Sequence, residues 1–245
     1  MLYWTKENII TERQKYLRRK ILDYSFELKL SHIGSCLAVI DIVDEIYNIK
    51  KQQDIFVLSN GHAGIALYTV LIDLGIMPLR YLKSKDFNIH PDRKEAYGLS
   101  VSTGSLGQGV TIALGMAIKS PQKTIYCCLS DGEATEGSVW ESLRIAVDHR
   151  VSNLVFIFNI NGYSAYDQTN NETLISRIKG FGLETLVING HNPVEIKNSL
   201  THPREKSTAI CALTCSEQFP FLTGIDAHYK VLSQDDYDLS LEILK

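Results

Sequence analysis

Asp131 and Asn161 are the two residues whose types and spacing most directly suggest chemistry in this sequence. Each follows a run of apolar, β-favouring residues, at 123–130 and 153–160 respectively. Such runs, bounded by turn residues and separated by a helical stretch, predict neighbouring strands of a parallel sheet. Open α/β sheets bind their ligands at the carboxyl ends of the strands. A carboxylate and an amide placed there offer two hard oxygen ligands, so the pair predicts a Mg²⁺ site that also takes phosphate oxygens.

Three histidines form a second group of candidates. His32, His62 and His90 lie in segments containing Gly, Asn or Pro, not on an apolar helix face. An imidazole can donate or accept a proton near neutral pH, which suits general acid–base work. A single histidine in a loop is usually only a solvated surface group, so the residues alone do not assign a function.

A glycine-rich segment at 103–109 is the third candidate. Its three glycines allow close approach of the backbone to a ligand, and the helix that follows would present free amides. A helix-capping turn packed beneath the sheet would have the same composition. The segment alone does not decide between these two roles.

The elements that must position these residues alternate between strand and helix. Repeated βα units predict an α/β fold, a doubly wound, mostly parallel sheet with helices on both faces. One domain spanning residues 1–245 is expected, with a helical N-terminal segment before the first strand, a short C-terminal tail and an irregular stretch at 78–98. The expected strands cover residues 54–58, 123–129, 153–160, 183–188 and 207–214. The 103–109 segment opens a helix that ends at 118, and the other expected helices cover residues 8–28, 37–47, 63–74, 138–149, 171–179 and 193–200.

The composition is that of an ordinary globular protein of 245 residues, with 44% hydrophobic and 22% charged residues. A net charge of −3 gives no electrostatic basis for binding nucleic acid or an anionic membrane. No apolar run reaches the roughly 18 residues that a membrane span needs, and the charged N-terminus is unlike a signal peptide. The odd number of cysteines predicts reduced thiols in a cytoplasmic protein, not a disulfide framework or a zinc site. The cysteines are Cys36, Cys127, Cys128, Cys211 and Cys215.

Six segments within residues 12–230 carry a resemblance to a known family. They read Ser-His-Ile-Gly at 31–34, Phe-Val-Leu-Ser-Asn-Gly-His at 56–62, His-Pro-Asp at 90–92, Ser-Thr-Gly-Ser-Leu-Gly-Gln-Gly at 102–109, Ser-Asp-Gly-Glu-Ala-Thr-Glu-Gly at 130–137 and Asn-Ile-Asn-Gly-Tyr at 159–163. In this order they resemble the transketolase family. The sequence is similar to the N-terminal subunit of a split transketolase, the half that binds the diphosphate end of thiamine diphosphate.

The resemblance implies that Asp131 and Asn161 are Mg²⁺ ligands, together with the backbone carbonyl of Tyr163. The family's Gly-Asp-Gly motif is followed at a similar distance by an Asn-containing segment, and here 161 − 131 = 30. The first Gly of that motif is a serine in this sequence. Gly132 would let the backbone approach the diphosphate, and Glu133 is placed with the cofactor-binding residues. Read alone, the Asp-Gly dipeptide would predict only a turn.

By the same resemblance, His32, His62 and His90 line the substrate channel, where they bind hydroxyls and assist proton transfers. His228, in Ala-His-Tyr-Lys, resembles a late segment in which the family places another active-site histidine. Glu136 resembles an acidic residue that communicates between two active sites. A surface glutamate in the first turn of a helix would occupy the same position. All five are candidate catalytic residues.

The 103–109 segment also gains a role from the resemblance. Gly104, Ser105 and Leu106 are implied to contact the pyrimidine and thiazolium region of the cofactor. His191, in Asn-Gly-His-Asn, matches a family segment as well and is expected to be structural or to stand behind the site.

The chemistry of the family needs a glutamate that hydrogen-bonds the aminopyrimidine of the cofactor. In this superfamily that glutamate lies on a second, pyrimidine-binding domain. Because the chain ends at Lys245, the domain is expected on a separately encoded C-terminal transketolase subunit. The cofactor would then lie between the two chains of an α2β2 assembly.

Residues 214–220 replace a basic Lys-Gly-Lys-Gly segment of the family with an acidic and apolar one, which argues against ordinary phosphosugar substrates. The expected reaction is transfer of a two-carbon ketol or acyl unit to a sugar-type carbonyl acceptor. Two alternatives remain open. One is a subunit that decarboxylates 2-oxo acids with acyl or aldehyde transfer, and the other is a non-catalytic scaffold subunit of the same fold.

Overall fold

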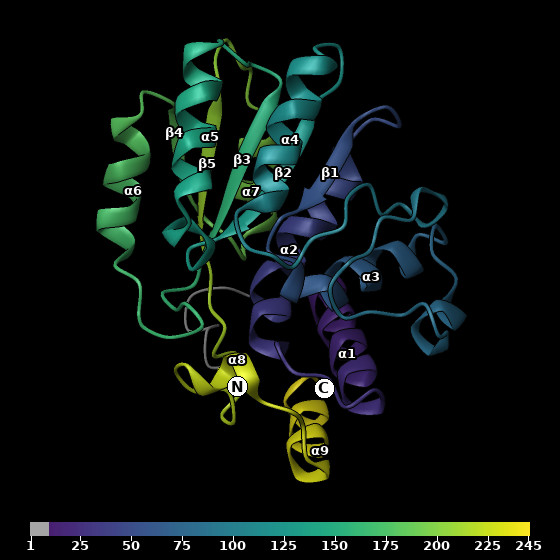
Figure 1. Ribbon diagram of the computed structural model, residues 1–245. Coiled ribbons are helices and arrows are strands. Elements are labelled where there is room, and N and C mark those ends of the chain that lie inside the picture. Colours follow the sequence, from purple (N-terminus) through teal and green to yellow (C-terminus); the bar gives the residue numbers. More distant parts are fainter. Residues whose placement is uncertain (1–9) are drawn as a thin grey trace.

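Five parallel strands form one central sheet in the computed structural model, which describes residues 10–245 (Figure 1). The strand order is β1-β2-β3-β5-β4, and each neighbouring pair runs parallel. The strands are β1 Ile55–Leu58, β2 Ile125–Ser130, β3 Leu154–Ile160, β4 Glu184–Asn189 and β5 Thr208–Leu213. Each predicted strand is present within two residues of its expected bounds. The predicted α/β fold is therefore confirmed.

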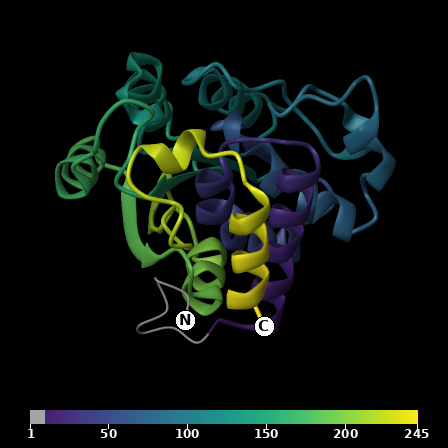
Figure 2. The ribbon, with the colours of Figure 1, turned by 90° about the horizontal axis from the view of Figure 1, so that it is seen from below.

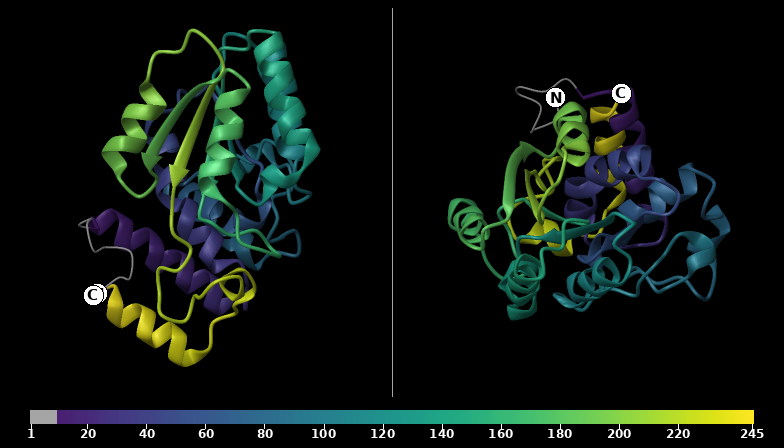
Figure 3. Two further views of the ribbon diagram at one scale, coloured as in Figure 1. Left: turned by 90° about the vertical axis from the view of Figure 1, so that its left-hand side faces the viewer. Right: turned by 90° about the horizontal axis from the view of Figure 1, so that it is seen from above.

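Seven helices flank the sheet within residues 10–245, and they cover both of its faces (Figure 3). In β3, Val155 and Ile157 pack with α1, α2, α3 and α7, whereas Phe156 and Phe158 pack with α4, α5 and α6 on the other face. Burial on both faces explains why the strands read as continuous apolar runs. The helices are α1 Glu12–Glu27, α2 Ile33–Ile49, α3 Gly64–Asp73, α4 Gln108–Lys119, α5 Gly137–Asp148, α6 Asn171–Gly180 and α7 Pro193–Thr201.

The first two helices differ from their predicted bounds. The expected start of α1 near residue 8 lies outside the described residues, and within them α1 begins after a capping box formed by Thr11 and Gln14. Helix α2 begins at Ile33, four residues earlier than predicted. Gly34 lies within the helix, and a Cβ there would lie only 3.1 Å from the carbonyl oxygen of Ser216. The glycine marks close packing at this point, not a break in the helix.

Two helices near the C-terminus were not predicted. Helix α8 (Asp226–Tyr229) borders the carboxyl ends of the strands, and α9 (Gln234–Ile243) lies beside α1 (Figure 2). Phe26 of α1 stacks on Tyr237 at 4.4 Å between ring centroids, and the Tyr237 hydroxyl donates to Asp23 (2.8 Å). The C-terminal segment is thus fastened to the first helix.

Residues 78–98 are irregular as predicted, apart from two short 3-10 helices, η2 (Leu79–Lys83) and η3 (Glu95–Tyr97). All five cysteines are free thiols. Within residues 10–245, none of the helices has the length and apolar character needed to cross a membrane.

Candidate functional site

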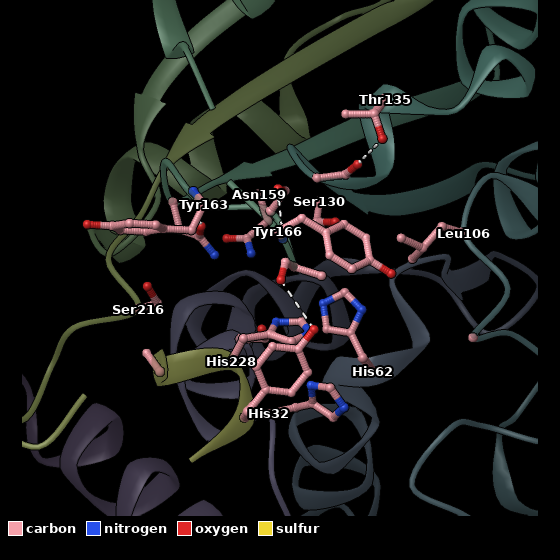
Figure 4. A pocket seen from close by; sticks show the side chains of 18 of the residues that line it. His32, His62, Leu106, Ser130, Thr135, Asn159, Tyr163, Tyr166, Ser216 and His228 are labelled. Atoms are coloured by element: carbon pink, nitrogen blue, oxygen red, sulfur yellow. Dashed lines mark hydrogen bonds between the residues drawn. The ribbon is translucent and has the colours of Figure 1, made fainter. Parts of the chain in front are cut away.

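A cleft of about 490 Å³ opens at the carboxyl ends of the strands, where parallel sheets bind ligands. Its walls come from the segments after β1, β2, β3 and β5, from the 103–109 segment, and from the start of α2 and from α8. Figure 4 shows His32, His62 and His228 on one side and Ser130 and Asn159 on the other. The volume lies within the range of small-molecule sites.

Asp131 and Asn161 lie on adjoining segments that follow the paired strands β2 and β3. The Asp131 carboxylate is buried, and its Oδ2 accepts hydrogen bonds from the Gly162 amide (2.8 Å) and from Thr169 Oγ1 (2.7 Å). The amide oxygen of Asn161 accepts a hydrogen bond from the Tyr163 amide (2.9 Å). These bonds fix the orientation of the oxygen atoms before any ligand binds.

Gly132 brings the two segments into close contact. A Cβ added there would lie 3.0 Å from Ser164 Cα and 3.8 Å from the carbonyl oxygen of Tyr163. The amide of Gly132 also donates to Asp131 Oδ1 (3.0 Å). The Tyr163 carbonyl therefore lies beside the turn that carries Asp131.

The oxygen atoms of Asp131, Asn161 and Tyr163 fit a hard divalent cation, because carboxylate, amide and carbonyl oxygens are the ligands that Mg²⁺ takes. Asp131 accepts three hydrogen bonds, and a carboxylate has about four acceptor positions. Burial raises the pKa of Asp131, and a bound cation would favour its ionised form. Among residues 10–245 no group of three or more His, Cys, Asp or Glu could hold a metal ion, so a cation site there requires such a mixed set.

Four histidines from separate parts of the chain meet in the cleft. The ring centroid of His32 lies 4.4 Å from that of His228, 5.6 Å from that of His62 and 6.2 Å from that of His90. The rings of His62 and His228 lie 5.2 Å apart. All four rings line the cleft, so the cluster is placed to contact a ligand there.

The cleft environment lowers the pKa values of His32, His62 and His228. Burial, together with smaller contributions from neighbouring histidines, lowers the pKa of His32 to about 4 and that of His62 to about 3. Burial also lowers the pKa of His228. Nδ1 of His32 is buried and has no hydrogen-bond partner among residues 10–245. Neutral imidazoles at pH 7 can both donate and accept a proton, which a charged cluster could not do.

The backbone of His32 explains how residues so far apart come together. His32 has a left-handed conformation (φ 63°) at the start of α2, and its carbonyl accepts a hydrogen bond from the Cys36 amide (3.0 Å). Its own amide donates to the carbonyl of His228 (3.0 Å). This bond fastens α8 to the start of α2, so the two rings remain adjacent.

The glycine-rich segment packs tightly against its neighbours. A Cβ added at Gly104 (φ 130°) would lie 2.7 Å from the ring of His90, and one added at Gly61 would lie 2.6 Å from the Gly104 amide. Gly107 (φ 78°) has the left-handed backbone from which α4 begins. Both roles considered for the segment are present, since it borders the cleft and also caps a helix.

The other predicted site residues lie in different positions. Gly104 and Leu106 line the cleft, and Glu136 lines it with an exposed side chain. Ser105 is exposed and lies outside the lining of the cleft. Glu133 is fully buried behind the glycine-rich segment and does not line the cleft.

Some residues that line the cleft were not predicted. Asn159 lies two positions before Asn161, so the alternation of an extended chain could have indicated it. Tyr166 is 88% exposed at the rim, and the Tyr229 hydroxyl donates to the carbonyl of Ala165 (3.2 Å). No sequence pattern marks Tyr166, which reaches the cleft through the path of its loop. Tyr229 lies in α8 and directly follows His228 in the Ala-His-Tyr-Lys segment.

A buried ion-pair network joins α1, α2 and the segment after β5. Arg18 forms a bidentate pair with Asp41 (2.6 and 2.8 Å), and its Nε donates to Gln218 (2.8 Å). His191 Nδ1 lies 2.8 Å from Asp41, and its Nε2 accepts a hydrogen bond from the Cys215 amide (2.9 Å). An amide can only donate, so the proton of this neutral ring is on Nδ1. His191 therefore anchors the segment that borders the cleft.

The chain matches the family model described as "Transketolase, thiamine diphosphate binding domain" over residues 15–236. It is 38% identical to transketolase of Mus musculus over 192 residues, which are 72% of this chain and 30% of that protein. It is 30% identical over 220 residues to 6-deoxy-6-sulfo-D-fructose transketolase subunit SqwG of Clostridium sp. (strain MSTE9), covering 80% of each chain. An apulose-4-phosphate transketolase subunit of Actinobacillus succinogenes is 27% identical over 96% of each chain. The chain thus spans 30% of the length of the mouse protein and most of the length of the two named subunits.

Solved transketolase structures have the same fold. That of Campylobacter jejuni superposes with a TM-score of 0.79 at 28% identity, over 95% of this chain and 42% of that chain. That of Leishmania mexicana gives a TM-score of 0.84 at 21% identity, over 96% of this chain and 42% of that chain.

Proposed function

Because this chain belongs to the transketolase family and contains its thiamine diphosphate-binding domain, we propose that it binds Mg²⁺–thiamine diphosphate as one half of a ketol-transferring enzyme. The observation that carries the proposal is that Asn161, Tyr163 and the histidine cluster line one cleft, with the buried Asp131 carboxylate held directly behind Asn161 by the Gly162 amide. One group suits a metal-bound diphosphate and the other suits a carbonyl substrate.

Asp131, Asn161 and the Tyr163 carbonyl would hold the Mg²⁺ ion, which in turn would bind the diphosphate. Gly104 and Leu106 border the part of the cleft proposed for the rings of the cofactor. When bound, thiamine diphosphate supplies an electron sink for bond breaking beside a carbonyl carbon. The contribution of the chain itself is to bind, orient and exchange protons.

His32, His62, His90 and His228 would bind the hydroxyls and carbonyl oxygen of a sugar-type substrate. His32 and His62 have lowered pKa values, so their neutral rings can donate one proton and accept another at pH 7. A cluster of charged imidazoles would repel protons and could not act as a base. The histidines are thus suited to general acid–base work on a polyol.

We propose that a separately encoded subunit completes the site. Two relatives that match this chain over most of their length are named as transketolase subunits. The partner would supply the glutamate that hydrogen-bonds the aminopyrimidine, in an α2β2 assembly with the cofactor between chains. The exposed side chain of Glu136 at the cleft is accessible to such a partner, which supports its proposed role in communication between sites.

The proposed reaction is transfer of a two-carbon ketol or acyl unit to a sugar-type carbonyl acceptor. The described residues that line the cleft include neither Lys nor Arg, which supports a substrate whose recognition on this side uses hydroxyls. Comparison of kcat/KM on fructose 6-phosphate with that on non-phosphorylated ketoses tests the substrate class. Equal values for the two donors would contradict it.

Calorimetric titration of Mg²⁺–thiamine diphosphate into the chain with its partner tests the proposed cofactor site. Asp131→Asn removes the charge that a cation needs, and we expect its affinity to fall at least about 100-fold. Asp54→Asn is the matched control. Asp54 is also a buried carboxylate that accepts two backbone hydrogen bonds, but it lies at the opposite end of the strands. Equal loss of affinity in both variants would refute the assignment.

A further inference from the structure

Glu133 is a fully buried acid that none of the steps proposed above uses. It lies on a short 3-10 helix, η4 (Glu133–Thr135), directly after the turn that carries Asp131. Burying a carboxyl group costs stability unless the group is well hydrogen-bonded. Its contacts therefore indicate what the residue does.

The carboxylate and the backbone amide of Glu133 together connect three parts of the site. Its Oε1 accepts hydrogen bonds from Ser59 Oγ (2.5 Å), which follows β1, and from the Gly107 amide (2.8 Å), which precedes α4. The amide of Glu133 donates to Ser130 Oγ (3.0 Å) at the end of β2. A single residue thus joins the ends of two strands to the glycine-rich segment.

The glycine-rich segment depends on such contacts because few of its own side chains can fasten it. A Cβ added at Gly109 would lie 2.6 Å from Ser59 Oγ, so the segment is packed against the same serine that Glu133 holds. On its other side, the Gly107 carbonyl accepts a hydrogen bond from Ser138 Oγ (3.0 Å). The backbone of Gly107 is therefore held from both sides by neighbouring side chains.

We propose that Glu133 is a positioning residue that fastens the 103–109 segment to the turn carrying Asp131. The proposal rests on the proposed function, in which this turn holds the diphosphate end of the cofactor and the segment borders its ring end. By joining the two, Glu133 would fix the distance between the groups that receive each end. It acts through Ser59 and Gly107 and touches no ligand itself.

Amide hydrogen exchange of the full chain tests the fastening without any ligand. In Glu133→Ala we expect the amides of residues 104–109 to exchange at least about tenfold faster, because a backbone hydrogen bond is lost. Glu133→Gln retains an acceptor oxygen for both donors and should remain within about threefold of the wild type. Unchanged exchange of this segment in Glu133→Ala would overturn the proposal.

Asn153→Ala is the matched destabilising control for the exchange experiment. The side-chain Nδ2 of Asn153 donates to three backbone carbonyls, those of Ala117, Ser120 and Lys123, at the opposite end of the strands. This variant should accelerate exchange near those residues and leave 104–109 unchanged. If it accelerated exchange at 104–109 as strongly as Glu133→Ala does, Glu133 would have only a general structural role.

A second experiment compares two ligands in the chain assembled with its partner. Inorganic diphosphate with Mg²⁺ probes the tail of the site alone, and Mg²⁺–thiamine diphosphate probes both ends. Glu133→Ala should weaken thiamine diphosphate about tenfold more than diphosphate, whereas Glu133→Gln and Asn153→Ala should leave the ratio of affinities unchanged. Equal losses for both ligands in Glu133→Ala would refute the positioning role. Failure of the wild type to bind either ligand would instead refute the proposed function, and the exchange result would still decide the fastening.

Discussion

Two groups of buried polar side chains in this protein differ in how completely they are hydrogen-bonded. In the buried ion-pair network, the side chains of Arg18, Asp41 and Gln218 bond one another and the backbone. Around the cleft, His32 Nδ1 and Asn159 Nδ2 are buried with no partner among residues 10–245. Unsatisfied buried groups cost stability. The first group therefore stabilises the fold, whereas the second leaves polar atoms available to a ligand and lowers the stability of the protein.

The largest effect that the comparison predicts is loss of the buried ion pair. Asp41→Ala leaves the buried Arg18 guanidinium without its carboxylate, and we expect the free energy of unfolding to fall by about 3–5 kcal/mol. Urea denaturation measures it. Asp44→Ala is the control, because Asp44 pairs with Arg13, whose side chain is 40% exposed, and should cost less than about 1 kcal/mol. Equal losses in the two variants would show that the buried network stabilises the fold no more than the partly exposed ion pair does.

The second prediction applies to the cleft, where a substitution should lower activity and leave the stability of the fold nearly unchanged. His62→Ala removes an imidazole from the histidine cluster, and we expect kcat/KM to fall about 100-fold or more. The free energy of unfolding at pH 7 should change by less than about 1 kcal/mol, since the desolvated ring is removed along with its contacts. His149→Ala, at an exposed site, should change neither quantity. A large loss of stability with normal turnover would place His62 in the scaffold instead.

The third prediction concerns pH. The pKa of His62 is about 3 in the fold, against an ordinary value of 6.5, so between these values the unfolded chain binds more protons than the folded one. The free energy of unfolding should therefore fall as the pH falls from 7. At pH 5, protonation of His62 in the unfolded chain should lower it by about 1–2 kcal/mol. His191, whose pKa is also lowered by burial, acts in the same direction. The pKa of Asp41 is also lowered, but the stability that its ionised form contributes is lost only below about pH 4.

His62→Gln separates these contributions. Denaturation curves between pH 7 and 5 should show a flatter dependence of stability on pH in this variant, with little change at pH 7. A slope identical to that of the wild type would mean that the cleft imidazoles titrate normally in the folded protein.

The smallest expected effect is at Gly132, where packing and not hydrogen bonding positions the ligand groups. Gly132→Ala places a methyl group 3.0 Å from Ser164 Cα, so the loop carrying the Tyr163 carbonyl must shift by a few tenths of an ångström. We expect the affinity for Mg²⁺–thiamine diphosphate to fall about threefold to tenfold with little loss of stability. Gly180→Ala, where nothing lies within 4 Å of an added Cβ, should bind normally. Normal binding by Gly132→Ala would show that the loop adjusts freely.

The sequence predicted the regular elements better than the connections that surround the cleft. Strand bounds followed from apolar runs and turn residues, and α5 and α7 from their helical periodicity. The start of α2 was placed too late, because Gly34 and its neighbours indicate a break unless the segment packed against them is known. Helix α8 has four residues, too few for a periodic pattern. The role of Glu133 was read from its motif, whereas its contacts show that it faces away from the cleft.

By itself the sequence determined the parallel α/β sheet and the placement of Asp131 and Asn161 after neighbouring strands, since apolar runs and turn residues are properties of local segments. Only the tertiary structure decided that β5 lies between β3 and β4, that four histidines share one cleft, and that Glu133 joins Ser59 to Gly107. Those relations depend on contacts between segments far apart in the chain. No local pattern encodes such contacts, because they depend on how distant helices, loops and strands pack together.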